Sequence, residues 1–153
     1  MPSGWLNVPH CKQEFNYSCL PACVRMVLAH HGRHLAEAEL RQLRATRSHG
    51  TKARNLTALG SLGFEVQLGS ANLSQLRDAL AASLPPIVFV DTGPLDYWKT
   101  DCAHVAVVVG INDTSVFFND PFYDAAPQQT SLPSFLQGWA RNGHLAAILL
   151  PRP

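Results

Sequence analysis

The order of hydrophobic patterns along the chain predicts an α+β fold. Apolar residues recur at the three- and four-residue spacing of helices through most of residues 1–84, and residues 85–153 contain the short apolar runs of strands. Helices followed by a block of strands are typical of this class, since parallel sheets require the two to alternate. We therefore expect a single domain, residues 1–153, in which a mainly helical lobe (1–84) packs on a mainly antiparallel β-sheet lobe (85–153).

The first half of the chain is expected to contain four helices and one strand. Leucines at helical spacing define the second and third helices, and Gly63 ends the third. Phe64–Leu68 alternates apolar and polar residues as a half-buried strand does. Asn72 is a favourable N-cap for the fourth helix, which Pro85 and Pro86 end. The expected elements are an extended arm over 1–12, helices over 19–31, 35–45, 51–62 and 72–83, and a strand over 64–68.

The second half is expected to contain four strands and one short helix. Ile87–Val90 is a short buried strand, and residues 112–115 form a hairpin turn between two apolar strands. Ser131 or Ser134 can cap a helix that carries Trp139. The expected elements are strands over 87–90, 104–111, 116–119 and 145–150, a helix that begins near 131–134, and polar loops over 91–102 and 120–130.

Composition and charge exclude several classes of function. Apolar residues make up 46% of the chain and charged residues 15%, and the net charge is +1. So small a net charge produces no field that would attract nucleic acid or an acidic membrane. The N-terminus lacks the apolar core of a signal peptide, and no apolar run approaches the ~20 residues of a membrane span. We expect a cytoplasmic protein with no transmembrane segment and no nucleic-acid partner.

Four cysteines are too few to form the disulfide framework of a chain of this length. Zinc is an alternative, because His10, Cys11, Cys19 and Cys23 lie close together in the sequence. Their spacing contains no CxxC pair and matches no common zinc finger or ribbon, so we expect neither a metal site nor a cofactor. Cys23 lies on the apolar face of the first helix and is expected to be a core residue. Cys11 and Cys102 have no assigned role.

The segment around Cys19 has the features of a nucleophile placed at the start of a helix. Ser18 is a favourable N-cap, whose hydroxyl is expected to accept from the free amides of the first turn. Pro21 is tolerated in that turn, where its missing N–H loses no partner, and Gly32 can end the helix in the left-handed conformation. Cys19 then lies at the positive end of the helix dipole, which stabilises a thiolate, the reactive form of cysteine.

A catalytic thiolate needs a base, and His104 is the candidate among seven histidines. If the hairpin turn centres on residues 112–113, His104 lies opposite Asp120 or one position away, with Cβ atoms about 5 Å apart. The carboxylate can then hold one imidazole nitrogen while the other faces the thiol. The alternatives are a hydrogen-bonded, half-buried strand histidine and an Asp-Pro turn residue. Gln13 can supply an oxyanion hole together with the Cys19 backbone N–H, although its spacing alone favours a surface glutamine.

These candidates lie in stretches that resemble the bacteriocin-leader-processing cysteine peptidases, also called double-glycine peptidases. The stretch from Gln13 through Cys19 to Gly32 resembles the first motif of that family: a glutamine, five residues, the cysteine and a helix rich in small residues. His104–Gly110, followed by Asn119-Asp120-Pro121, is similar to its second motif. Residues 131–139 and the final apolar strand are similar to its closing segment, so the likeness covers nearly the whole chain.

The resemblance implies a papain-like cysteine peptidase fold and assigns roles by position. Gln13 would be the oxyanion donor, Cys19 the nucleophile, His104 the base and Asp120 the residue that orients it. Leu20 departs from the family, which usually has glycine or another small residue there, and is expected to narrow the approach to the thiol or alter the position after the cleaved bond. Members that process leader peptides are often fused to a transporter's membrane and ATPase domains, and this sequence contains neither. Double-glycine specificity is therefore not carried over.

The expected function is a cysteine peptidase that hydrolyses a bond in a peptide or leader peptide through a Cys-His-Asp triad and a thioester. Its partner would be a peptide or protein substrate, and association with a transporter stays open. One alternative is a peptide-binding module of the same fold that no longer cuts, and another is a thiol amidase or acyltransferase acting on a non-protein amide. Retention of both Cys19 and His104 favours an enzyme, since degenerate relatives usually lack one of them.

Overall fold

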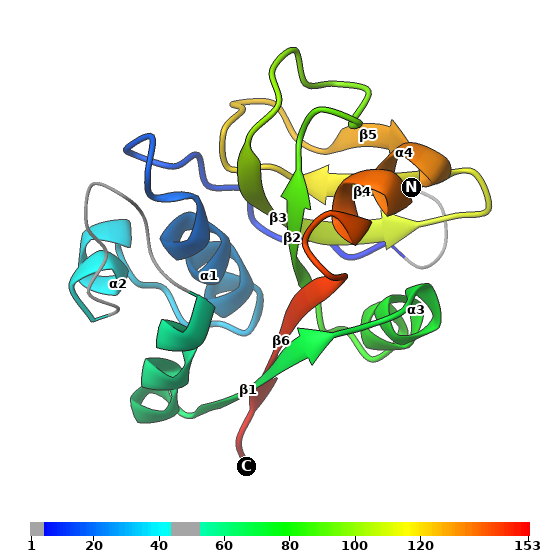
Figure 1. Ribbon diagram of the computed structural model, residues 1–153. Helices are drawn as coiled ribbons and strands as arrows, with labels where there is room; N and C mark the ends of the chain where they lie inside the picture. The colour runs from blue at the N-terminus through cyan, green and yellow to red at the C-terminus, as the bar shows by residue number, and fades with distance from the viewer. Residues whose placement is uncertain (1–4, 44–52) are drawn as a thin grey trace.

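The computed structural model describes residues 5–43 and 53–153 and shows an antiparallel sheet with helices on both faces (Figure 1). The strands follow the order β1-β6-β2-β3-β4-β5, and each adjacent pair is antiparallel. They are β1 (Phe64–Ser70), β2 (Ile87–Asp91), β3 (Ala103–Ile111), β4 (Ser115–Asn119), β5 (Gln128–Ser131) and β6 (Leu145–Pro151). The predicted α+β class with a mainly antiparallel sheet is confirmed.

One face of the sheet is covered by the helices of the N-terminal part. These are α1 (Cys19–His30), α2 (Glu37–Leu43) and the 3₁₀ helix η1 (Ala53–Leu62). Buried residues of α1 pack with Val105, Val107 and Val109 of β3 in one continuous core. Because successive strand residues face opposite sides, these odd-numbered valines all point toward the helices that precede the sheet.

The other face is covered by α3 (Leu73–Ala81) and α4 (Leu132–Ala140). Ala106 and Val108 of β3 contribute to this second core, together with Phe135 and Trp139 of α4. Strand β3 is therefore buried on both sides, which explains why its sequence is an almost continuous apolar run. Among the described residues, no helix combines the length and apolar character needed to cross a membrane.

Three of the predicted helix ends have the expected chemistry, and one does not. The Asn72 side chain accepts from the Gln75 amide at 2.8 Å, in a capping box that opens α3. The Ser131 hydroxyl accepts from the Ser134 amide at the start of α4, and Gly32 follows α1 with φ +84°. The prediction that the Ser18 hydroxyl caps α1 is wrong: the hydroxyl accepts from the Phe15 amide and donates to the Phe15 carbonyl, both at 3.0 Å.

Three further predictions about elements need correction. The expected α-helix over 51–62 is a 3₁₀ helix where it is described, and it contains Thr57 and Gly60, which have low helix propensity; residues 51–52 lie outside the described part. The expected helix over 35–45 begins at Glu37, and residues 44–45 also lie outside. β5 occupies part of the predicted loop 120–130, because this polar edge strand is defined by pairing with β4 rather than by its own pattern.

Candidate active site

Cys19 is the first residue of α1, and its thiol is half-buried. The helix is anchored on β3 by its apolar face, and the fully buried Cys23 donates from Sγ to the Val105 carbonyl at 3.5 Å. Cys23 is thus the core residue that the sequence predicted. Leu20 is 2% exposed and packs in the same core, so its burial gives no support to the expectation that it obstructs the thiol.

His104 and Asp120 come together at the end of the sheet where β3 begins and β4 ends. His104 Nε2 lies 2.7 Å from Asp120 Oδ1, and both side chains are almost completely shielded from solvent. The register that predicted this pair is nevertheless wrong. Val107 pairs with Asn119, and a β-bulge shifts the ladder between Val108 and Gly110. His104 and Asp120 therefore meet across the diagonal of the hairpin, a distance that a long side chain can span.

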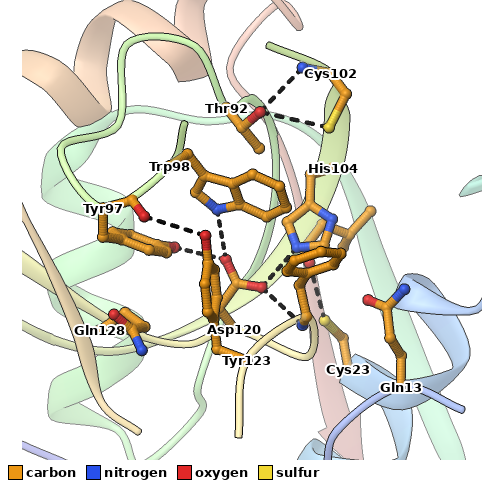
Figure 2. Close-up of polar contacts among 12 residues, drawn as sticks. Gln13, Cys23, Thr92, Tyr97, Trp98, Cys102, His104, Asp120, Tyr123 and Gln128 are labelled. Atoms are coloured by element: carbon orange, nitrogen blue, oxygen red, sulfur yellow. Dashed lines mark hydrogen bonds and ion pairs between the residues drawn. The ribbon is translucent and has the colours of Figure 1, made fainter. Parts of the chain in front are cut away.

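The Asp120 carboxylate also accepts from two aromatic side chains that sequence reasoning did not assign to the site. Tyr97 Oη donates to Oδ2 at 2.7 Å and Trp98 Nε1 donates to the same oxygen at 3.0 Å (Figure 2). The Phe122 backbone amide donates to Oδ1 at 3.0 Å. Both aromatic residues lie in the loop between β2 and β3. Their only sequence signal was the presence of two aromatic side chains with polar tips in a loop of turn formers.

Trp98 also encloses the imidazole. Its ring centroid lies 4.9 Å from that of His104, and on another side it packs against Phe122 at 4.8 Å. The Tyr123 hydroxyl donates to the Tyr97 carbonyl at 3.1 Å and ties the loop to the segment after Asp120. The His104–Asp120 pair is thereby held in an environment with little water, where electrostatic interactions are strong.

The electrostatics favour a charged imidazole beside a charged carboxylate. Burial disfavours the imidazolium, but hydrogen bonds and charges from Asp120 and Cys19 outweigh it and raise the pKa of His104 to about 9. Burial likewise disfavours the Asp120 carboxylate, yet its hydrogen bonds with His104 and Tyr97 lower the pKa of Asp120 overall. Burial and the nearby Asp120 charge raise the pKa of Tyr97 well above its ordinary value, so its hydroxyl stays a donor.

The orientation of the imidazole leaves one nitrogen for the thiol. Nε2 is bound to Asp120 Oδ1, and Cys19 lies close enough to His104 to raise the pKa of the imidazole. With Nε2 occupied by Asp120, Nδ1 is the ring nitrogen that remains for Cys19. The structure thus brings together three residues from distant parts of the chain: one at a helix start and two at adjacent strand ends.

Gln13 lies in the loop before α1 and is linked to the other side of the site through the backbone. The backbone N–H of Gln13 donates to the carbonyl of Pro121, the residue after Asp120, at 2.7 Å. In the view of Figure 2, His104 stands between Asp120 and Gln13. Gln13 Nε2 donates to the Phe15 carbonyl at 2.8 Å, and Oε1 is buried with no hydrogen-bond partner among the described residues. An amide nitrogen carries two protons, so one remains available.

A cleft of about 440 Å³ adjoins this glutamine. It lies between the loop before α1 and Phe122, and its lining residues are Lys12, Gln13, Glu14, Phe15, Asn16 and Phe122. Phe15 and Phe122 are both more than two-fifths exposed. In the described part of the chain, no cluster of three or more His, Cys, Asp or Glu side chains has the arrangement of a metal site.

Solved structures of peptidase domains share this fold. The peptidase domain of Streptococcus ComA, a bifunctional ABC transporter of a quorum-sensing pathway, matches with a TM-score of 0.78 and 26% identity, over 95% of this chain and 100% of that one. A putative C39-like peptidase from Bacillus anthracis matches with a TM-score of 0.76 and 17% identity, over 95% and 96%. A double-glycine motif protease from a PCAT transporter, solved with its leader peptide, has a TM-score of 0.76 and 19% identity, over 99% and 96%.

The chain belongs to the Peptidase C39 family, whose profile matches residues 7–147. An uncharacterised protein of Methanothermobacter marburgensis is 33% identical over 111 residues, which cover 72% of this chain and 69% of that protein. The resemblance to double-glycine peptidases and the predicted papain-like architecture are thereby confirmed.

Proposed function

We propose that this protein is a cysteine peptidase that hydrolyses a bond in a peptide or leader-peptide substrate. The observation that carries the proposal is the buried His104, whose Nε2 lies 2.7 Å from Asp120 Oδ1 and whose pKa is raised by Asp120 and by the nearby Cys19. A thiol at a helix start, an imidazole and a carboxylate in this sequence of contacts form the arrangement that activates a nucleophile. Membership of the Peptidase C39 family supports the same chemistry.

The steps follow from the contacts. Cys19 Sγ attacks the substrate carbonyl carbon as a thiolate, with its proton held by His104. The protonated imidazole then gives that proton to the leaving nitrogen as the C–N bond breaks, which leaves a thioester on Cys19. Water attacks the thioester carbon while His104 takes a proton from the water, and the C–S bond then breaks, which releases the acid product and regenerates the Cys19 thiolate. A pKa of about 9 keeps His104 protonated at neutral pH, as release of an amine requires.

The negative oxygen of the tetrahedral intermediates needs donors that are already in place. The free N–H of the Gln13 amide and the backbone N–H of Cys19 are the two proposed donors. The cleft beside Gln13 lies next to this oxyanion site and is large enough to hold several atoms of an extended peptide. Association with a transporter, as in the ComA protein whose peptidase domain this chain resembles, is part of the same proposal for the natural partner.

The first test is selective alkylation by iodoacetamide at neutral pH, mapped to individual cysteines by mass spectrometry. We expect Cys19 to react faster than Cys11, Cys23 and Cys102, and we expect this advantage to disappear in His104→Ala. A peptide library cleaved by the wild type and left intact by Cys19→Ala would then establish peptidase activity and its cleavage site.

The outcomes separate the candidate functions. Equal and slow labelling of the exposed thiols, with no effect of His104→Ala, would favour a peptide-binding module without catalysis. Selective Cys19 labelling with no cleavage in the library would point to an amidase or acyltransferase that acts on a non-protein amide.

A further inference from the structure

Glu37 is a fully buried carboxylate that the proposed chemistry does not use. It belongs to the first turn of α2, and its relative exposure is 0%. A carboxylate without solvent must be compensated by hydrogen bonds or charges, and an uncompensated one costs several kcal/mol. The partners of Glu37 are therefore the groups whose positions it determines.

Two of these partners lie in the loop that precedes Cys19. The Glu14 backbone amide donates to both carboxylate oxygens of Glu37, at 3.1 Å and 3.2 Å. The Ser18 hydroxyl, which is bound to the Phe15 backbone, lies close enough to the Glu37 carboxylate to lower its pKa, so the carboxylate and the Phe15 carbonyl are alternative acceptors for its single proton. One carboxylate thus contacts this loop near its beginning and at its end.

The two contacts stand next to the two proposed oxyanion donors. Glu14 directly follows Gln13, and Ser18 directly precedes Cys19. The residues between them, Phe15 and Asn16 in particular, are exposed and have no core packing to hold them. The spacing between the Gln13 amide and the Cys19 N–H consequently depends on the polar contacts at the two ends of the loop.

Arg41, one turn further along α2, completes the attachment. Its guanidinium makes an ion pair with Glu37 at 3.4 Å and a hydrogen bond to the Glu14 side chain at 3.1 Å. The same guanidinium lies over the Phe15 ring, 4.5 Å from its centroid. Burial raises the pKa of Glu37, and the Glu14 amide, the Ser18 hydroxyl and the Arg41 charge act in the opposite direction.

We propose that Glu37 is a positioning residue that sets the distance between the Gln13 side-chain amide and the Cys19 backbone N–H, and hence the geometry of the oxyanion hole. This inference rests on the proposed function, because it takes Cys19 as the nucleophile and Gln13 as a donor. Loss of Glu37 should impair only those reactions of Cys19 that develop an oxyanion. Reactions of the same thiol without an oxyanion should be spared.

Two reagents on one thiol make this distinction. p-Nitrophenyl acetate acylates Cys19 through a tetrahedral oxyanion: sulfur bonds to the carbonyl carbon, the C–O bond breaks and p-nitrophenolate leaves. Iodoacetamide alkylates the same sulfur by displacing iodide from a methylene carbon, with no oxyanion. The ratio of the two rates at Cys19, corrected for the Cys19→Ala background, therefore reports on the oxyanion hole without knowledge of the natural substrate.

We expect Glu37→Ala to lower the acylation rate about 10- to 100-fold, since a 1 Å displacement near the reacting atoms can cost that much. Alkylation should change less than about twofold. Glu37→Gln keeps one acceptor oxygen for the Glu14 amide and should restore part of the acylation rate. Glu39→Gln is the matched control: Glu39 is exposed on the same helix, accepts from the Ala36 amide, and should leave both rates unchanged.

A double-mutant cycle tests whether Glu37 affects acylation through Gln13. In a Gln13→Ala protein the donor that Glu37 positions is already absent, so Glu37→Ala should lower acylation much less than it does in the wild type. Fully additive losses would overturn the proposal, as would parallel losses of acylation and alkylation or no loss of either. If Glu37→Ala fails to fold by circular dichroism, the same criteria apply to Glu37→Gln. Failure of the peptidase proposal itself has another signature, namely that wild-type Cys19 shows no selective, His104-dependent alkylation.

Discussion

Asp120 is a single residue that shows how this protein stabilises a buried charge. Its carboxylate is 0% exposed and contacts the donors of Tyr97, Trp98, His104 and the Phe122 amide. Hydrogen bonds to charged groups contribute about 1.5–3 kcal/mol each, which offsets the cost of removing the carboxylate from water. The two aromatic donors leave one oxygen, Oδ1, for the imidazole and thereby determine its orientation.

The first prediction concerns the pH dependence of stability due to His104. Because its pKa rises from 6.5 in the unfolded chain to about 9 in the folded protein, the protonated imidazole stabilises the fold fully below pH 6.5. That contribution, about 3 kcal/mol by the size of the shift, should decline as pH rises from 6.5 and vanish above pH 9. Urea unfolding of the wild type and of His104→Ala at several pH values measures it. A free-energy difference between the two proteins that does not change between pH 6.5 and 10 would contradict the prediction.

At the scale of elements, α4 shows how closely a helix approaches the sheet. Gly138 faces β2, and a Cβ atom at that position would lie 2.5 Å from the Asp91 carbonyl oxygen. Asn142, just after the helix, donates to the Asp91 side chain at 2.9 Å and fixes the same contact. The absence of a side chain at position 138 therefore sets the distance between the two elements.

We predict that Gly138→Ala destabilises the protein by about 1–2 kcal/mol. Alanine improves helix propensity by about 0.5–1 kcal/mol, but a clash with a backbone oxygen cannot be relieved by a rotamer change, and overpacking costs about 1–3 kcal/mol. Urea denaturation measures the net effect. Gly69→Ala is the control, because a Cβ there meets no atom within 4 Å. Equal stability of the two variants would show that α4 can move away from β2 at little cost.

At the scale of the whole molecule, the two cores share one sheet. Strands β2 and β3 contribute residues to both cores. Strands β1 and β6 come from distant parts of the chain and pair with each other. Separation of a helical lobe from a sheet lobe would expose the face of β3 that packs against α1. The single domain over residues 1–153 stays a prediction, and the sheet shared by the two cores leads us to expect that they unfold as one cooperative unit.

We predict that both faces of the sheet unfold together in urea. Pulsed labelling of the Cys23 thiol, which is buried in the first core, reports on one face. Fluorescence of Trp139 in a Trp5→Phe/Trp98→Phe protein reports on the other, since the chain has three tryptophans. Two-state unfolding gives the same midpoint for both probes. Two separate midpoints would show that the lobes are independent domains.

Local patterns predicted much of this architecture. Helical spacing of apolar residues, Gly32, Asn72 and Ser131 located the ends of helices, because capping and left-handed glycine depend on neighbouring residues. Non-local pairing explains one of the errors, because β5 is a strand only through its pairing with β4. The error at Ser18 is local: its hydroxyl binds the Phe15 backbone, three residues earlier, instead of capping α1.

Reading the residues in order was enough to select the candidates for the chemistry: a cysteine at a helix start, and a histidine and an aspartate at the base of a hairpin. The glutamine in the loop before the cysteine was selected by the resemblance to a family, since its spacing alone favours a surface residue. The cysteine, histidine and aspartate candidates depend on residue type and short-range spacing, both of which can be read from the sequence alone. The groups that support these residues became visible in three dimensions: Tyr97 and Trp98 donate to Asp120, and Glu37 accepts from the Glu14 amide in the loop before Cys19. Such contacts join residues more than 20 positions apart, and their geometry arises when the helices close on the sheet.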